Sequence, residues 1–130
     1  IRHDSDELTR MSAMPAFGRD NLLSSGEIDD LAQHVLSFSG RQTDTDAAAR
    51  GSLLFASQCV SCHGADAKGS RAVGAPNLTD ADWLFGGEPA DIRATITNAR
   101  NAHMPAWQGR LDDPTIKALA VYVHSLGGGE

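Results

Sequence analysis

Two cysteines and a histidine in the stretch CVSCH, at residues 59–63, carry the most specific chemistry in the chain. On a short helix, Cys59 and Cys62 lie nearly one turn apart on the same side, so both sulfurs can form thioethers with the two vinyl groups of a haem. His63 is then brought beneath the ring, where its imidazole ligates the iron. The spacing therefore predicts one covalently attached c-type haem.

Three other uses of this cysteine pair fit the sequence less well. A thioredoxin-like redox pair needs a preceding strand and a βαβ pattern, and neither is found. A zinc site needs another cysteine or a closely spaced histidine pair, and the chain has only two cysteines. A disulfide between Cys59 and Cys62 would close a very small loop, which makes it a poor structural staple.

A second axial ligand to the iron is expected from methionine or histidine. Met104 follows His63 at a distance that lets a loop return over the opposite face of the ring, and Pro105 stiffens that loop. Thioether ligation favours Fe(II) and raises the potential, which suits an electron carrier. Met104 as a core side chain is the alternative. The other histidines are His3, His34, His103 and His124. His103 is expected to be a neighbour of the ligand, with a ligand role as its alternative, and His34 and His124 fall in helix patterns, where surface exposure or core packing is expected.

The stretch around Met104 has a counterpart near the start of the chain. The two copies read MPAFG, from Met14, and MPAWQG, from Met104. A polar turn, an amphipathic helix pattern and a glycine follow each copy, with helix starts predicted at Ser24 or Ser25 and at Asp112 or Asp113. No attachment motif precedes Met14 in the chain, so we predict that Met14 ligates no haem of its own and that residues 1–40 pack as a remnant or on another copy.

The rest of the chain predicts helices joined by loops. A helix is expected over about 45–58, capped by Thr43, Asp44 or Thr45, with Leu54 and Phe55 directed inward. Residues 64–79 are rich in Gly, Ala and Pro and predict a long loop, and a further helix is expected from about 88 to 99. No segment alternates convincingly like a strand, so the predicted class is all-α.

The composition describes a soluble globular protein of one domain, or of one small domain and a fragment. The chain has 130 residues, 41% hydrophobic and 22% charged, with a formal net charge of −6. This charge argues against nucleic-acid binding, which needs a basic face. No apolar run is long enough to span a bilayer, and the start at Ile1 leads us to expect a processed or truncated product.

Residues 44–127 resemble a class I cytochrome c domain, in which the N- and C-terminal helices cross over the haem. The matching pieces are Gly51 with Phe55, CVSCH, GAPNLTD at 74–80, HMPAW at 103–107, and Leu119 with Tyr122. The resemblance implies that Gly51 lets the two helices approach closely. It also implies that the carbonyl of Pro76 accepts a hydrogen bond from Nδ1 of His63, and that Asn77 helps to hold the methionine loop. From the residues alone, Pro76 and Asn77 are ordinary turn formers.

A closer resemblance is to the subunit of cbb-type haem–copper oxidases, subunit III, that carries two c-type haems in tandem. GAPNLTD, DWLFGG, NARNAHMPAWQGRL and LAVYVHSLGG are similar to its second haem domain, and MPAFG followed by LAQHVLSFSG is similar to the end of its first. The resemblance implies a remnant of the first domain at 1–40 and a complete monohaem domain at 41–130. The attachment motif of the first domain and the family's N-terminal membrane helix are not in this chain, so we expect neither a second haem nor an anchor in it.

The resemblance implies one-electron transfer between a donor cytochrome and the oxidase core, on the periplasmic side of the bacterial cytoplasmic membrane, without enzymatic turnover by this chain. Trp83 and Trp107 are candidates for packing in the haem pocket, and Arg100 for pairing with a propionate. For the two tryptophans the alternative is core filling, and for Arg100 it is a solvated surface position. The runner-up function is a haem sensor or a peroxidase-like enzyme with an open or displaceable axial position. A third is a structural helical module with redox-inactive cysteines.

Overall fold

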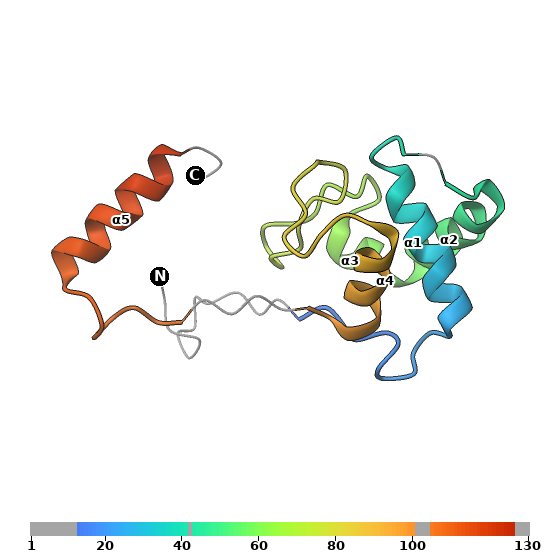
Figure 1. Cartoon of the computed structure of the whole chain (residues 1–130), viewed down its shortest axis with the longest axis horizontal. Helices are drawn as coiled ribbons and strands as arrows, with labels where there is room; N and C mark the ends of the chain where they lie inside the picture. Colours follow the sequence, from blue (N-terminus) through green and yellow to red (C-terminus); the bar gives the residue numbers. More distant parts are fainter. Residues whose placement is uncertain (1–12, 42, 101–104, 127–130) are drawn as a thin grey trace. The chain divides into compact units, whose positions relative to one another are not determined.

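The computed structural model describes residues 13–41, 43–100 and 105–126, and this part of the chain is helical. The helices are α1 (Ser25–Ser37), α2 (Thr45–Gln58), α3 (Val60–His63), α4 (Pro89–Asn98) and α5 (Asp113–Ser125). Isolated β-bridges occur, but the described ranges contain no strand, which confirms the all-α class. The chain divides into two compact units, one holding α1 to α4 and the other α5, and each is described by itself (Figure 1).

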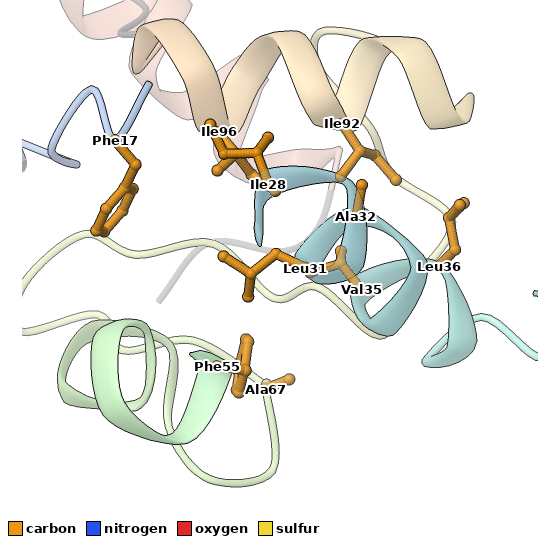
Figure 2. Close-up of a cluster of buried hydrophobic side chains, with 10 residues drawn as sticks. All are labelled: Phe17, Ile28, Leu31, Ala32, Val35, Leu36, Phe55, Ala67, Ile92 and Ile96. Atoms are coloured by element: carbon orange, nitrogen blue, oxygen red, sulfur yellow. The ribbon is translucent and has the colours of Figure 1, made fainter. Parts of the chain in front are cut away.

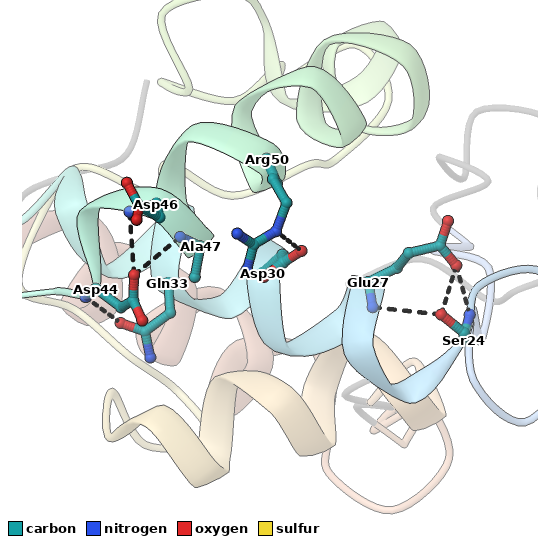
Figure 3. Close-up of polar contacts among 8 residues, drawn as sticks. All are labelled: Ser24, Glu27, Asp30, Gln33, Asp44, Asp46, Ala47 and Arg50. Carbon is teal, nitrogen blue, oxygen red and sulfur yellow. Dashed lines mark hydrogen bonds and ion pairs between the residues drawn. The ribbon is translucent and has the colours of Figure 1, made fainter.

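Helices α1, α2 and α5 begin at residues whose side chains accept backbone hydrogen bonds. At α1, the Ser24 hydroxyl accepts from the Glu27 N–H at 3.4 Å, and the Glu27 carboxylate accepts from the Ser24 N–H at 2.8 Å (Figure 3). Asp44 caps α2 by accepting from two backbone N–H groups of the first turn, both at 3.0 Å. Asp112 caps α5 in the same way, at 2.9 Å from the Thr115 N–H. The helix starts predicted from the sequence are therefore confirmed.

Helix α1 crosses α2 closely at Gly51, the residue for which the family resemblance implied a close approach of helices. A Cβ added at Gly51 would overlap the backbone carbonyl oxygen of Asp30 and lie 2.9 Å from Cβ of His34. Helix α1 packs here through a buried apolar stripe at helical spacing. The crossing by the last helix, with Leu119 and Tyr122, stays a prediction, because α5 belongs to the other unit.

The core of this unit lies between α1, α2 and α4 (Figure 2). Leu31 of α1 is 1% exposed, and Phe55 of α2 is directed inward as predicted. The buried residues of the cluster are Phe17, Ile28, Leu31, Ala32, Val35, Leu36, Phe55, Ala67, Ile92 and Ile96. Burial of such side chains contributes about 1.5–3 kcal/mol each, which makes this cluster the main source of stability in the unit.

The stretch MPAFG docks on the end of α4 through its backbone. The N–H of Phe17 donates to the carbonyl of Ile96 at 3.2 Å, and the N–H groups of Gly18 and Arg19 donate to the carbonyl of Thr97 at 3.2 and 2.9 Å. Gly18 is required here because a Cβ would lie 2.7 Å from Cγ2 of Thr97. The described part of the first repeat is thus built into the same unit as CVSCH.

In the other unit, α5 and the turn before it form a shallow apolar pocket. The N–H groups of Arg110 and Leu111 donate to the carbonyl of Trp107 at 2.9 and 3.0 Å, which folds the turn back toward the helix. The pocket is lined by Trp107, Leu111, Ile116, Leu119 and Val123. No residue of α5 is buried. Within the described ranges, none of the helices is long and apolar enough to cross a membrane.

Candidate haem-attachment site

The CVSCH stretch forms one helical turn directly after α2. The N–H of Cys59 donates to the carbonyl of Phe55 and ends α2, and the N–H groups of Cys62 and His63 then donate to the carbonyl of Cys59 at 3.1 and 2.9 Å. This geometry confirms the predicted short helix. It puts the two sulfurs on one turn, as attachment to two vinyl groups requires.

Both cysteines are free thiols, Cys59 half-buried and Cys62 exposed. Burial, with a smaller contribution from Cys62, raises the pKa of Cys59 to about 11. A thiol with that pKa is protonated at neutral pH, whereas the attacking cysteine of a thioredoxin-like pair reacts as a thiolate. The environment of Cys59 therefore argues against the thioredoxin-like alternative, and among the described residues no group of three or more His, Cys, Asp or Glu side chains could hold a zinc ion.

His63 is the buried polar residue of the described core, with 8% of its surface exposed. Its Nδ1 lies 3.1 Å from the carbonyl oxygen of Pro76, the contact that the family resemblance implied. Since a carbonyl can only accept, Nδ1 carries the proton and the lone pair of Nε2 is left for a metal. Burial lowers the pKa of His63, although the Pro76 bond opposes this, so the imidazole is neutral at pH 7.

The loop after α3 holds Pro76 in this place. The N–H of Gly69 donates to the carbonyl of His63 at 2.8 Å, and the N–H of Leu78 donates to that of Ala67 at 2.8 Å. Gly69 has φ +80°, and a Cβ there would lie 2.6 Å from the backbone of Pro76. A side chain at Gly69 would therefore push the loop away from the imidazole.

The other predicted pocket residues lie in ordinary structural roles. The Asn77 side chain accepts from the N–H and hydroxyl of Thr79 at 2.9 and 2.8 Å, which forms a local turn. Trp83 is half-buried against the core, and Trp107 belongs to the α5 unit. Arg100 donates to the carbonyl of Phe85 at 3.2 Å, and its guanidinium lies 5.8 Å from the centre of that ring. Contact of these side chains with a haem stays a prediction.

Of the two methionines in the repeated Met-Pro-Ala pattern, the structure describes only Met14. Met104 and His103 lie outside the described residues, as does His3. Met14 is half-buried and packs against the core cluster, alongside Cys59 and Val60. The sequence analysis gave Met14 no function at this site, and the one available signal was the repeated Met-Pro-Ala pattern.

These residues fit a c-type haem. Two free thiols share one turn, and the imidazole beside them is buried with its Nδ1 occupied and its Nε2 available. This is the donor set that covalent attachment and proximal ligation need.

Comparison with known proteins agrees with this donor set. Residues 46–123 match the family model described as cytochrome c oxidase, cbb3-type, subunit III. The chain belongs to this family. It is 50% identical over its whole length to the cbb3-type oxidase subunit CcoP of Cereibacter sphaeroides, and 56% identical over 94% of its length to the subunit FixP of a Bradyrhizobium species.

The chain spans less than half of these subunit III relatives, 45% of the Cereibacter protein and 42% of the Bradyrhizobium protein. The family predicted from the sequence is confirmed, and with it the class of c-type cytochromes. For this part of a subunit III protein, covalent haem c is the expected cofactor.

Proposed function

We propose that the chain transfers single electrons through one c-type haem joined to Cys59 and Cys62 and ligated by His63. The observation that carries this proposal is the hydrogen bond from Nδ1 of buried His63 to the carbonyl of Pro76, directly after the free cysteine pair. Bound haem would supply a reversible Fe(III)/Fe(II) couple. The chain supplies attachment, an oriented imidazole and an environment that sets the potential.

The core around His63 serves this function by excluding water from one side of the site. His63 is 8% exposed, in the unit whose apolar core contains Ala67, 0% exposed, and Phe55, 4% exposed. A rigid, dry surrounding reduces the rearrangement that accompanies a change of iron charge. The carbonyl of Pro76 makes the imidazole a stronger donor, which stabilises the oxidised iron.

A methionine is the distal ligand in this proposal, and two methionines qualify. The sequence favours Met104, because its loop follows the attachment motif as in other class I cytochromes. Met14 also qualifies, because it is half-buried and packs against the core cluster, as Cys59 does. Met104 is therefore the first ligand to test, with Met14 as its matched control.

The test compares Met14→Ala with Met104→Ala in the haem-loaded chain. Loss of the thioether-to-iron charge-transfer band of the oxidised protein in Met14→Ala alone assigns Met14, and loss in Met104→Ala alone assigns Met104. A high-spin spectrum of the unsubstituted protein with ready binding of carbon monoxide after reduction would contradict methionine ligation. It would favour instead the haem sensor or peroxidase-like enzyme.

Covalent attachment is tested separately. Haem staining that survives denaturing electrophoresis, with an intact mass of one haem per chain, is the expected result. Cys59→Ala with Cys62→Ala should remove the stain. A mass without haem would contradict the proposal. It would favour the third alternative, a structural helical module with redox-inactive cysteines.

The proposed partners follow from the relatives, which are named as subunits of cbb3-type cytochrome c oxidases. We propose that this chain, as part of a longer protein, passes electrons between a donor cytochrome and the oxidase core on the periplasmic side of the bacterial cytoplasmic membrane. Its net charge of −6 supports a protein partner with a basic surface and argues against nucleic acid. Reduction of a purified oxidase core by the haem-loaded chain is the direct assay.

A further inference from the structure

The loop that follows α3 is wound tightly by three residues with a left-handed backbone. Gly64, Ala67 and Gly69 have φ angles of +78°, +57° and +80°. The N–H of Ala67 donates to the carbonyl of Gly64 at 3.1 Å, and the N–H of Gly69 donates to the carbonyl of His63 at 2.8 Å. The loop therefore returns to the residue from which it started, and Gly69 is bonded to the backbone of the proposed iron ligand.

Gly69 also lies very close to the carbonyl group of Pro76. A Cβ added at Gly69 would overlap the carbonyl oxygen of Ala75 and lie 2.6 Å from the carbonyl oxygen of Pro76. The same Pro76 oxygen lies 3.1 Å from Nδ1 of His63. Because a Cβ cannot approach a backbone oxygen so closely, the place of this oxygen depends on the absence of a side chain at residue 69.

Backbone hydrogen bonds hold the chain on both sides of Pro76. Ser70 and Ala75 exchange two of them, each of 3.0 Å, and the N–H of Leu78 donates to the carbonyl of Ala67 at 2.8 Å. The ring of Pro76 fixes its own φ angle. A segment tied in this way has little freedom to bend around an added Cβ, so the Pro76 carbonyl itself would be displaced.

The Pro76 carbonyl determines how the imidazole of His63 is presented. His63 is 8% exposed, so an Nδ1–H group without this acceptor would be buried and unsatisfied. A hydrogen bond donated by Nδ1 fixes the orientation of a ligating imidazole and makes it a stronger donor to the metal. A stronger donor stabilises Fe(III) relative to Fe(II), which lowers the reduction potential.

We propose that Gly69 is a positioning residue for the proximal ligand. Its missing side chain lets the Pro76 carbonyl approach Nδ1 of His63, and this approach orients the imidazole and lowers the reduction potential of the haem. The effect on the potential rests on the proposed haem function, whereas the effect on the imidazole does not.

The test compares Gly69→Ala with Gly64→Ala, its matched control, in the haem-loaded chain. Both substitutions put alanine at a left-handed φ angle, so both should lower the urea midpoint of unfolding. The Cβ added at Gly64 approaches only Oδ1 of the Asp66 side chain, at 2.9 Å, and the Gly69 carbonyl oxygen, at 4.0 Å. Only Gly69→Ala should shift the Fe(III)/Fe(II) equilibrium toward Fe(II), by about tenfold, a rise of about 59 mV in a redox titration.

The hydrogen bond itself is measured by nuclear magnetic resonance of the reduced, haem-loaded protein. The Nδ1 proton of His63 should exchange with solvent about tenfold faster in Gly69→Ala than in the unsubstituted protein or in Gly64→Ala. If no haem is attached, the proposed function fails, and the same three proteins are compared as free thiols. There the expected result is a proton on Nδ1 of His63 in all but Gly69→Ala, in which Nε2 is also protonated.

A second variant covers the case in which Gly69→Ala does not fold. Asparagine tolerates a left-handed backbone better than alanine does, but it carries the same Cβ. Gly69→Asn should therefore raise the potential as Gly69→Ala does, with a smaller loss in the urea midpoint. Gly64→Asn is its control.

An unchanged potential and an unchanged exchange rate in the Gly69 variants would overturn the proposal. So would an equal rise in Gly64→Ala, because strain in the loop rather than the approach to Pro76 would then set the potential. A rise in Gly69→Ala that Gly69→Asn lacks would contradict it, since the Cβ is common to both. A rise without faster exchange would also contradict it, because the hydrogen bond would then be intact.

Discussion

Helices α1 and α5 show how one sequence pattern leads to two different environments. Ile28, Leu31 and Val35 of α1 are buried, whereas none of the corresponding residues of α5 is. Both helices have a side-chain cap, an acidic residue in the first turn and a histidine in the last. Local signals therefore set where each helix begins and ends, and the available partner surface sets which apolar face is buried.

The largest difference between the two helices is expected at their central leucines. Leu31→Ala removes a side chain that is 1% exposed and leaves a cavity between α1, α2 and α4, so the free energy of unfolding should fall by about 2–5 kcal/mol. Leu119→Ala removes one that is 42% exposed and should change it by no more than about 0.5 kcal/mol. Urea unfolding measures both. Equal losses would mean that α5 is buried as deeply as α1 in solution.

The crossing at Gly51 gives the next largest effect. Gly51→Ala places a methyl group into the backbone of Asp30, and the strain should lower the free energy of unfolding by about 1–3 kcal/mol. Gly26→Ala is the matched control, because nothing lies within 4 Å of an added Cβ there and alanine favours a helix. Its expected effect is a stabilisation of up to about 1 kcal/mol. Destabilisation by both substitutions would argue against a specific contact at Gly51.

Removal of the capping side chain should destabilise a different unit for each of the two helices. Ser24→Ala removes the capping box of α1 and should lower the free energy of unfolding of its unit by about 1 kcal/mol. Asp112→Ala should lower the helicity of α5, measured by circular dichroism, and leave the unfolding of the α1–α4 unit unchanged. A common loss in both variants would show that the two units unfold together.

The smallest expected effect is a pH dependence of the free energy of unfolding that comes from His34 of α1, a position at which α5 has no histidine. Burial lowers the pKa of His34, whose ring contacts Phe38 and Phe55 with centroids 4.8 and 5.3 Å apart, while α5 has Tyr122 at this position. Below the ordinary histidine pKa of about 6.5 the unfolded chain binds a proton that the folded chain resists. The free energy of unfolding should therefore decrease as the pH falls from about 7 and level off below the lowered pKa.

His34→Phe keeps the aromatic contacts and should reduce the slope in that range, and the slope that remains is assigned to His63, whose pKa burial also lowers. The comparison uses urea midpoints at several pH values for both proteins. If the substituted protein keeps the full slope, His34 binds protons equally in the folded and unfolded states and the prediction is wrong.

The sequence predicted the local features of this molecule well. CVSCH indicated the attachment turn, Gly51 indicated a close helix crossing, and the caps indicated the helix starts, because each signal acts within a few residues. The hydrogen bond between His63 and Pro76 was also anticipated, through the family resemblance.

The packing of α1 on α2 was not predicted, because it is a long-range property. Two helices of one chain share an apolar stripe, and periodicity alone cannot say which of them lies on α2. The packing of Met14 against the core cluster was missed for the same reason, since most of that cluster belongs to α1.

The three hydrogen bonds between residues 17–19 and the end of α4 have a consequence for the connectivity of the α1–α4 unit. They hold the segment that enters the unit against the end of its last helix. A unit whose entering and leaving segments meet in this way can in principle be carried on a loop of another protein, because both connections leave from the same place.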